Sequence, residues 1–288
     1  MSEKVVSREY KVLLQKDLFI GNEQEILKKS HDFWQDFSQA INNIVINVNG
    51  DLDEITDQRI IRFYDSNNYT FYCNNYILRE RQDINNGERE VTLKFRHPDR
   101  YISQDRTMNR GETKFEEDIK TDIKTPFEVL YSFSDTQKIS TTEKLDKIQD
   151  AAKLYPDLQD KLSPLQLEDE IKIIGFSIRE LVIKGGKFQI RKDPRLNSQC
   201  ALIFWYENEK NEDNPIAVEF SFKYGDENEN YTRKMAQRAY DVFQILQKQL
   251  TDWVDLESDT KTAYIYKLGG FNKTYCHRLN NVKMKVFT

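Results

Sequence analysis

The sequence has 288 residues, of which 38% are hydrophobic and 12% aromatic, and its formal net charge is −5. A chain of this length can bury a substantial core, and the composition is typical of a globular rather than a disordered protein. The acidic balance argues against general nucleic-acid binding, and no apolar run approaches the roughly 18 residues that a membrane-spanning helix needs. Residues 1–10 are charged and lack an apolar signal core, which predicts a cytoplasmic protein.

Three cysteines, Cys73, Cys200 and Cys276, are spread along the chain without a Cys-x-x-Cys motif. An odd number with this spacing predicts neither a zinc site nor a disulfide framework. The simplest interpretation is a reducing compartment.

Most apolar residues alternate with polar ones, which is the period of a half-buried strand. In chain order we expect strand 7–14, helix 22–44, strands 59–65, 77–81 and 91–96, a polar loop 97–112, strand 113–119, helical stretches within 126–168 that include 142–155, strand 171–182, strand 187–191 after a Gly185-Gly186 turn, strands 200–207 and 217–224, and an amphipathic helix 232–254. Eight or nine strands with helices between them indicate an α+β protein with one closed or nearly closed antiparallel barrel. We expect a single domain over 1–268, with helical insertions near 22–44 and 126–168, followed by a basic tail over 269–288.

Two neighbouring strands joined by a short turn carry four cations. Because side chains alternate between the faces of a strand, Arg79 shares a face with Arg81, and Lys94 shares a face with Arg96. If the strands pair as a hairpin, all four gather on one patch. Like charges ~6 Å apart repel by roughly 3 kcal/mol per pair at an effective dielectric near 20. The patch therefore needs water, carboxylates or a polyanionic ligand.

The other strands repeat this separation of charged and apolar faces. Either the apolar face is the core and the charged face is solvated, or the barrel has a polar lumen and an apolar outer wall covered by helices. In the second case four carboxylates and about seven cations line the lumen, namely Glu9, Glu116, Asp118, Glu219, Lys11, Arg79, Arg81, Lys94, Arg96, Arg191 and Lys223. That mixture suits a metal-chelated polyphosphate, since Arg and Lys bind phosphate oxygens and carboxylates bind Mg²⁺ or Mn²⁺.

Several of these strands resemble motifs of the CYTH superfamily, the triphosphate tunnel metalloenzymes. Ser7-Arg8-Glu9-Tyr10-Lys11 is similar to the superfamily motif ExExK. Leu78-Arg79-Glu80-Arg81 is similar to the motif Leu-Arg-x-Arg, and Thr92-Leu93-Lys94-Phe95-Arg96 is similar to the motif Thr-Leu-Lys-x-Arg. Further likenesses are found at Tyr64-Asp65-Ser66, Lys114-Phe115-Glu116-Glu117-Asp118 and Glu219-Phe220-Ser221. Their order and spacing agree with the superfamily over about residues 5–268.

The resemblance implies an eight-stranded antiparallel tunnel with helices packed outside. Members hydrolyse triphosphate, thiamine triphosphate or nucleoside triphosphates, or cyclise ATP, with a divalent metal. Carried over to this chain, the phosphate-binding residues are Lys11, Arg79, Arg81, Lys94 and Arg96, to which Arg191 is added from its polar face. The ligands of Mg²⁺ or Mn²⁺ are Glu9, Glu116, Asp118 and Glu219, with Glu9 and Glu116 also as catalytic residues that position the attacking water.

Two departures from these motifs weaken the acidic half of the expected site. Ser7 stands where ExExK has its first Glu, and Ser221 stands where Glu-x-Glu has its second. A serine hydroxyl is a poorer partner for Mg²⁺ than a carboxylate, so the phosphate clamp is better preserved than the metal site.

Three functions stay open. The first is a metal-dependent hydrolase of inorganic triphosphate or nucleoside triphosphates, with adenylate cyclisation as a minor branch. The second is a non-catalytic module that binds polyphosphate or a nucleotide beside a degenerate metal site. The third is an interaction scaffold in which the charges merely satisfy one another. Neither a membrane nor a nucleic acid is expected as a partner.

Overall fold

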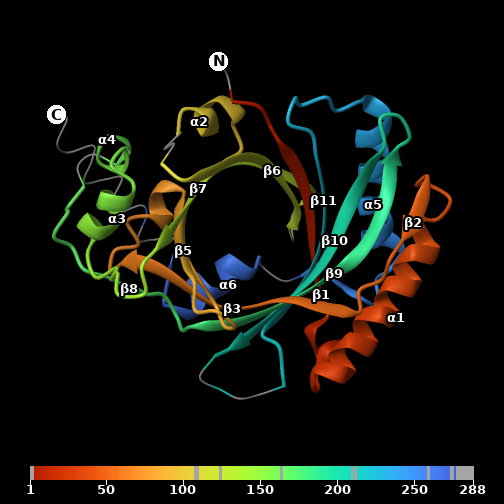
Figure 1. Ribbon diagram of the computed structural model, residues 1–288, viewed down its shortest axis with the longest axis horizontal. Coiled ribbons are helices and arrows are strands. Elements are labelled where there is room, and N and C mark those ends of the chain that lie inside the picture. Colours follow the sequence, from red (N-terminus) through yellow and green to blue (C-terminus); the bar gives the residue numbers. More distant parts are fainter. Residues whose placement is uncertain are drawn as a thin grey trace. The chain divides into compact units, whose positions relative to one another are not determined.

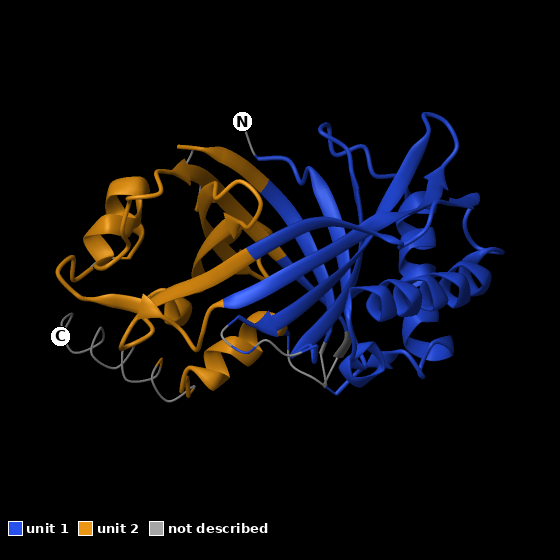
Figure 2. Ribbon diagram, turned by 60° about the horizontal axis from the view of Figure 1, so that its bottom comes forward, with its two compact units in different colours: residues 1–59, 115–130, 178–260 blue, residues 60–114, 131–177, 261–288 orange. Residues whose placement is uncertain are grey.

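A computed structural model describes residues 3–106, 110–122, 125–162, 165–208, 210, 213–257, 260–272 and 276 of the chain (Figure 1). The chain divides into two compact units (Figure 2). Unit 1 comprises residues 1–59, 115–130 and 178–260, and unit 2 comprises residues 60–114, 131–177 and 261–288. The single domain expected over 1–268 stays a prediction.

Most of the expected basic tail lies outside the described residues, including Lys273, His277, Arg278, Lys283 and Lys285. Within the described part of the chain, no helix has both the length and the apolar character needed to span a membrane.

The strands are β1 (Ser7–Leu14), β2 (Asn47–Asn49), β3 (Glu54–Ser66), β4 (Tyr76–Asp83), β5 (Arg89–His97), β6 (Glu112–Asp122), β7 (Thr125–Ile139), β8 (Ile171–Ile173), β9 (Ile178–Arg191), β10 (Leu196–Glu207), β11 (Ala217–Gly225) and β12 (Val254–Asp255). The helices are α1 (Glu23–Ile41), α2 (Arg100–Gln104), α3 (Ile148–Leu154), α4 (Leu158–Lys161), α5 (Arg233–Gln249) and α6 (Lys261–Leu268), with short 3-10 helices η1 (Lys16–Phe19) and η2 (Tyr72–Asn74).

Nine of the described strands form a closed sheet. Their hydrogen-bonded order is β9-β10-β11-β1-β6-β7-β5-β4-β3, and it returns to its start because β3 also pairs with β9. This confirms the expected α+β barrel with helices outside, with nine strands in place of eight. The expectation of a purely antiparallel barrel is corrected, because β1 and β6 run parallel, with Glu9 beside Asp118. A parallel pair needs a long crossover, and the segment between β1 and β6 supplies one.

In unit 1, helices α1 and α5 cover the apolar face of the strands. Tyr10 of β1 stacks on Phe222 of β11 with ring centroids 4.7 Å apart, and Phe243 of α5 meets Tyr10 at 5.3 Å. Helix α1 begins at a capping box between Asn22 and Glu25. Its apolar stripe enters the same core, which bears out the expectation of an apolar wall covered by helices in this unit. The buried residues of that stripe include Ile26, Phe33, Trp34, Phe37 and Ile41.

In unit 2, helices α3 and α6 lie against the strands. The buried Tyr155, which follows α3, donates a hydrogen bond from its hydroxyl to the Val91 carbonyl of β5 at 2.8 Å. Tyr266 of α6 stacks on Tyr72 with ring centroids 4.0 Å apart, and it contacts Phe63 of β3 at 6.4 Å. Aromatic residues therefore join both helices to this part of the sheet.

Residues 125–139 form strand β7, although we expected a helical stretch there. The sequence has aromatic or β-branched residues at alternate positions here, at Phe127, Val129, Tyr131 and Phe133, and this pattern favours a strand. Among the described residues of 126–168, helices follow only at α3 and α4, so the expected helical content is confirmed only in the second half of this range.

The Gly185-Gly186 pair lies inside β9 and not at the turn we expected. The pairing of β9 with β10 shifts register at this point, which is a β-bulge. Gly185 has a φ of +130°, and a Cβ on Gly186 would lie 2.8 Å from the Trp34 ring. The glycines therefore serve both the bulge and the close approach of helix α1.

A disulfide joins Cys73 and Cys276, which lie 203 residues apart, with a Cα–Cα distance of 5.0 Å. The cysteine count predicted no disulfide, so this expectation is corrected. Cys200 is free and buried. In the same region the Tyr69 hydroxyl, shortly before η2, donates to the Gly269 carbonyl after α6 at 2.6 Å. The disulfide therefore reinforces contacts between the segment 69–74 and the chain after α6.

Candidate functional site

The four predicted cations lie on one face of the hairpin formed by β4 and β5 in unit 2. In the antiparallel register Arg79 is opposite Thr92, and Lys94 is opposite Ile77. Residues opposite each other point to the same side of a sheet, so Arg79 and Arg81 share a side with Lys94 and Arg96. We call these four residues the cationic face. The hairpin and its shared face are as predicted.

Hydroxyl groups continue the cationic face onto β7. Ser134 is opposite Lys94, and Ser132 is opposite Arg96, in the pairing of β5 with β7. Both serines are buried, and Thr136 forms a 2.9 Å hydrogen bond with Thr92. Sequence reasoning missed these hydroxyls because it placed β7 in a helix. The alternation along β7 would have found them.

An acidic residue of the adjacent strand lies beside this face. Glu90 lies opposite Arg81, and the guanidinium Nη1 is 3.5 Å from the Glu90 carboxylate, with both side chains about a third exposed. A partly exposed ion pair of this kind contributes little to the free energy of unfolding. Four cationic side chains on one face of a hairpin suit an anion with several negative groups.

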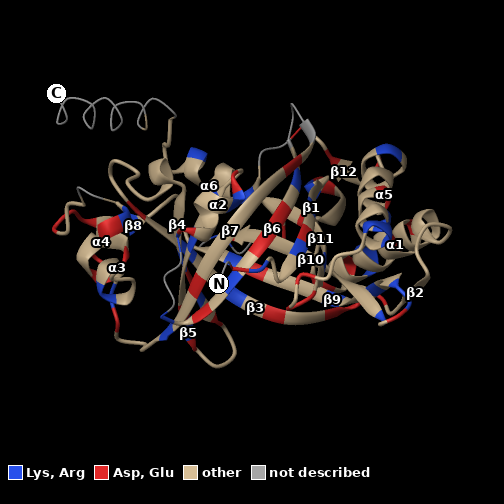
Figure 3. Cartoon of the chain, turned by 90° about the horizontal axis from the view of Figure 1, so that it is seen from above, with Lys and Arg blue, Asp and Glu red and all other residues tan. Residues whose placement is uncertain are grey.

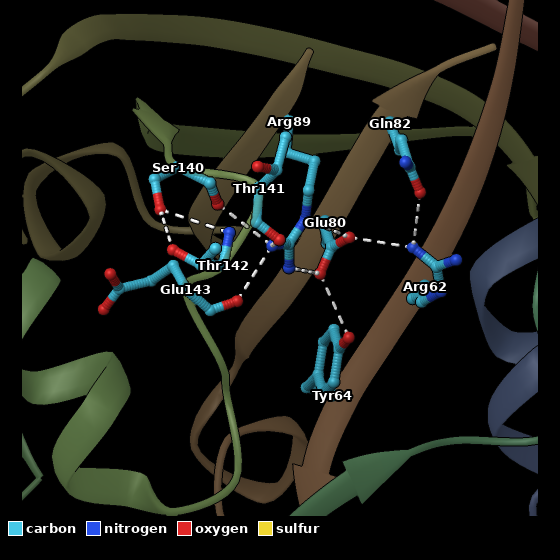
Figure 4. A network of polar contacts seen from close by, with 9 residues as sticks. All are labelled: Arg62, Tyr64, Glu80, Gln82, Arg89, Ser140, Thr141, Thr142 and Glu143. Atoms are coloured by element: carbon cyan, nitrogen blue, oxygen red, sulfur yellow. Dashed lines mark hydrogen bonds and ion pairs between the residues drawn. The ribbon is translucent and has the colours of Figure 1, made fainter. Parts of the chain in front are cut away.

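The opposite face of the same hairpin holds a buried carboxylate, Glu80, between two arginines (Figure 4). Arg62 donates to Glu80 at 2.8 Å, Arg89 donates at 3.0 and 3.1 Å, and the Tyr64 hydroxyl donates at 3.0 Å. Burial alone would raise the pKa of Glu80, but the hydrogen bonds and charge of Arg89, with the charge of Arg62, hold it below its ordinary value. Glu80 is thus an ionised structural residue that points away from the cationic face.

A second part of the resemblance, Tyr64-Asp65-Ser66, has a structural role. Asp65 is fully buried, and its carboxylate accepts hydrogen bonds from the backbone N–H groups of Ser66, Phe71 and Tyr72 at 2.8 to 2.9 Å. It holds the turn between β3 and η2. This arrangement satisfies backbone donors that would otherwise be buried without partners.

In unit 1 the predicted carboxylates lie on the neighbouring strands β1, β6 and β11, whose acidic segments are red in Figure 3. Glu9 is beside Asp118 of β6 and opposite Lys223 of β11, while Ser7 is beside Glu116. Glu219 is opposite Leu13 and so points to the same side. We call the set Glu9, Glu116, Asp118 and Glu219, with Lys11 and Lys223, the carboxylate face.

Lysines bind most of these carboxylates. Lys11 Nζ lies 2.9 Å from Glu9 and 2.7 Å from Asp118, and Lys223 Nζ contacts Glu116. Glu116 also accepts a 2.6 Å hydrogen bond from the Ser7 hydroxyl. The carboxylate face therefore contains ion pairs between lysines and carboxylates.

These contacts keep Glu9 and Lys223 ionised at neutral pH. Burial would raise the pKa of Glu9, as would the neighbouring Asp118 and Glu116, but Lys11 and Lys223 hold it below its ordinary value. Burial would lower the pKa of Lys223, and Glu116 and Glu9 outweigh that effect and raise it.

The carboxylate face fits a divalent metal poorly. Among the described residues, no group of three or more His, Cys, Asp or Glu side chains is arranged to hold a metal ion. Ser7 and Ser221 supply hydroxyls where the family motifs have carboxylates, and lysine ammonium groups contact the oxygens that a metal would use. The roles of the four acids as metal ligands, and of Glu9 and Glu116 in catalysis, stay predictions.

Arg191, predicted to bind phosphate, lies at the end of β9 with partners in nearby turns. Its guanidinium donates to the Pro194 carbonyl at 2.9 Å and to the Asn230 carbonyl at 3.0 Å, and it lies 3.4 Å from the Asp226 carboxylate. These contacts hold the chain around β9 and β11. A role in phosphate binding stays a prediction for this residue.

No model of a protein family and no curated protein matches the chain. Among solved structures, an adenylyl cyclase candidate of Hippeastrum with a dominant triphosphatase activity is similar, with 12% identity, a TM-score of 0.45, and coverage of 93% of this chain and 98% of the other. An adenylate cyclase candidate of Bacillus halodurans is also similar, with 12% identity, a TM-score of 0.36, and coverage of 91% of this chain and 97% of the other. So is an adenylate cyclase candidate of Vibrio parahaemolyticus, with 10% identity, a TM-score of 0.35, and coverage of 91% of this chain and 98% of the other. The likeness to each of these proteins concerns the fold alone.

Proposed function

We propose that this protein binds a small molecule that carries a triphosphate, either inorganic triphosphate or a nucleoside triphosphate. The observation that carries the proposal is the register of β4 with β5, which gathers Arg79, Arg81, Lys94 and Arg96 on one face. Arginine and lysine together are the side chains that best bind phosphate oxygens.

The spacing of the cationic face favours several phosphate groups over one. Residues two apart on a strand are about 6.6 Å apart, and neighbouring strands are about 4.8 Å apart. The four charges are therefore spread over more area than one phosphate covers. Ser134 and Ser132 lie opposite Lys94 and Arg96 and add hydroxyl groups to this part of the sheet.

Nucleic acid fits this face less well than a small ligand. Arg79, Arg81, Lys94 and Arg96 are all partly buried, and the chain as a whole has a net charge of −5. A nucleic-acid backbone needs a broad and exposed basic surface to neutralise many phosphates at once.

Isothermal titration calorimetry with sodium tripolyphosphate and with ATP tests the proposal. Loss of two cations in Arg79→Ala/Lys94→Ala should weaken binding by more than tenfold, since charge-assisted hydrogen bonds contribute about 1.5–3 kcal/mol each. Arg195→Ala, which removes an exposed positive charge from a turn, is the matched control and should leave affinity unchanged. A folded protein that binds neither compound, with or without Mg²⁺ or Mn²⁺, would contradict the proposal.

Hydrolysis of the bound triphosphate is a second candidate. The observation in its favour is that Glu9 stays ionised beside three further carboxylates on one face. Release of phosphate from tripolyphosphate or ATP in Mg²⁺ or Mn²⁺ tests it, and loss of turnover in Glu9→Gln would assign the activity to this face. Binding without turnover would instead support the non-catalytic module. If Arg79→Ala and Lys94→Ala change only stability, the scaffold hypothesis gains support.

A further inference from the structure

We infer that Lys11 and Lys223 take the place of a divalent cation on the carboxylate face, so that this protein binds triphosphate without a metal. The first part concerns the carboxylate face alone. The second part rests on the proposed function and names the condition under which that binding occurs.

Ammonium groups already contact Glu9, Glu116 and Asp118. Lys11 contacts both Glu9 and Asp118, at 2.9 and 2.7 Å, and so joins β1 to β6. Lys223 contacts Glu116 and joins β11 to β6. Bridging carboxylates of different strands is what a metal ion does in a metal site, and here side chains of the same strands do it.

The two serines complete this arrangement. The Ser7 hydroxyl donates to the same Glu116 oxygen that Lys223 contacts, so this oxygen has two donors before any ligand arrives. Ser221 is opposite Lys11 in the register of β1 and β11, where a carboxylate would have added a third acidic neighbour to that lysine. With hydroxyls at both positions, the lysines offset half of the negative charge of the face.

A metal would have to displace these lysines. Mg²⁺ and Mn²⁺ need several oxygen ligands at close range, and a bound ammonium group both occupies those oxygens and repels the cation. Glu116 and Asp118 are almost completely buried, so a displaced ammonium would leave their remaining charge with fewer partners. Lys223 is 39% exposed and has donor capacity beyond its contact with Glu116, which suits it to an anionic ligand.

Electron paramagnetic resonance of Mn²⁺ tests the first part, using the full chain at increasing metal concentration. The wild-type protein should leave the signal of free Mn²⁺ at its buffer value. Lys11→Met/Lys223→Met removes both ammonium groups with little loss of side-chain volume and should reduce the free signal as Mn²⁺ binds the released carboxylates. Lys184→Met removes a lysine paired with Asp57 in the same unit and should behave as wild type.

Binding of Mn²⁺ by the wild-type protein at micromolar metal would overturn the inference. Failure of the double variant to bind Mn²⁺ would show that the lysines are not what excludes the metal, and would also overturn it. Circular dichroism verifies that the double variant is folded. If it is not, Lys11→Gln/Lys223→Gln takes its place, because it removes the same two positive charges while keeping side chains that can donate hydrogen bonds to the carboxylates.

Calorimetry with sodium tripolyphosphate tests the second part, in EDTA and in Mn²⁺. We expect tripolyphosphate to bind in EDTA at least as tightly as in Mn²⁺, where chelation by the metal offsets part of the negative charge of the ligand. Binding that occurs only with Mn²⁺ would overturn metal independence while leaving the proposed function intact. If tripolyphosphate binds in neither buffer, the proposed function fails, and the Mn²⁺ titration still decides whether the lysines replace the metal.

Discussion

Lys223 lies directly opposite Glu9 in the register of β11 with β1, yet its ammonium group contacts Glu116 on the far side of β1. The position on β1 beside Glu116 is Ser7, whose side chain is short. A longer residue there would obstruct the path of the lysine. The replacement of a motif glutamate by Ser7 and the pairing of Lys223 with Glu116 are therefore two aspects of one local arrangement.

Ser7→Ala should destabilise the protein by about 2 kcal/mol. The substitution removes a hydrogen bond to an ionised and buried carboxylate, Glu116, and such bonds contribute about 1.5–3 kcal/mol. Urea unfolding measures the change. Ser140→Ala, which removes an exposed hydroxyl contact with Thr142, should alter the free energy of unfolding by less than about 0.5 kcal/mol. Equal effects of the two substitutions would contradict this account of Ser7.

Glu80→Gln should destabilise the protein at neutral pH by about 2–3 kcal/mol, because it leaves Arg62 and Arg89 without their buried partner. The pKa of Glu80 is lowered in the folded state. Its contribution is therefore fully present above the ordinary pKa of glutamate and is lost as the pH falls through the lower folded value.

The difference in stability between wild type and Glu80→Gln should accordingly shrink below about pH 4. Urea unfolding at several pH values measures it. Glu88→Gln removes an exposed carboxylate paired with Lys138 and is the control, with a small difference at every pH. A Glu80→Gln difference that stays constant down to pH 3 would show that Glu80 is not the ionised centre of this network.

Reduction of the Cys73–Cys276 disulfide should lower the free energy of unfolding by about 2–4 kcal/mol, since the bond closes a long loop. Urea unfolding with and without dithiothreitol measures the effect, and Cys276→Ser should reproduce the reduced state. Cys200→Ser, which alters the free and buried cysteine, should still respond to dithiothreitol. Intact mass that is unchanged by reduction would show that the disulfide is not formed.

Gly186→Ala should destabilise the protein by about 1–3 kcal/mol, because the added methyl group would lie 2.8 Å from the Trp34 ring. Combining it with Trp34→Leu should make the two effects less than additive, since the smaller side chain makes room for the methyl group. A double-mutant cycle by urea unfolding gives the coupling energy. Strict additivity would show that Gly186 is needed for the bulge in β9 and not for contact with Trp34.

Local patterns in the sequence were sufficient to predict the main features of the barrel. Alternation assigned β1 to its observed residues and placed the four cations on one face of β4 and β5. It also predicted the polar face of β1 that carries Glu9 and Lys11. These predictions succeeded because the side-chain period of a strand is fixed by its backbone geometry.

The features that were missed depend on residues far apart in the sequence. The parallel pairing of β1 with β6 and the bond between Cys73 and Cys276 leave no local pattern. The contact of Lys223 with Glu116 depends on a side chain reaching past a neighbouring strand, which the register alone does not reveal. Alternation along β7 was a local pattern, and here the prediction failed because its aromatic residues were assigned to a helix.

The place of β1 in the sheet has a consequence for how the chain folds as it is synthesised. β1 precedes the other described strands of the sheet in the chain, and its main neighbours, β6 and β11, come about a hundred and about two hundred residues later. At about 5–20 residues per second, the ribosome needs roughly 10–40 s to reach β11. During that time Tyr10 and Val12 lack the strand that later packs beside them. Folding of unit 1 should therefore be late and slow, and the nascent chain should benefit from a chaperone that shields β1.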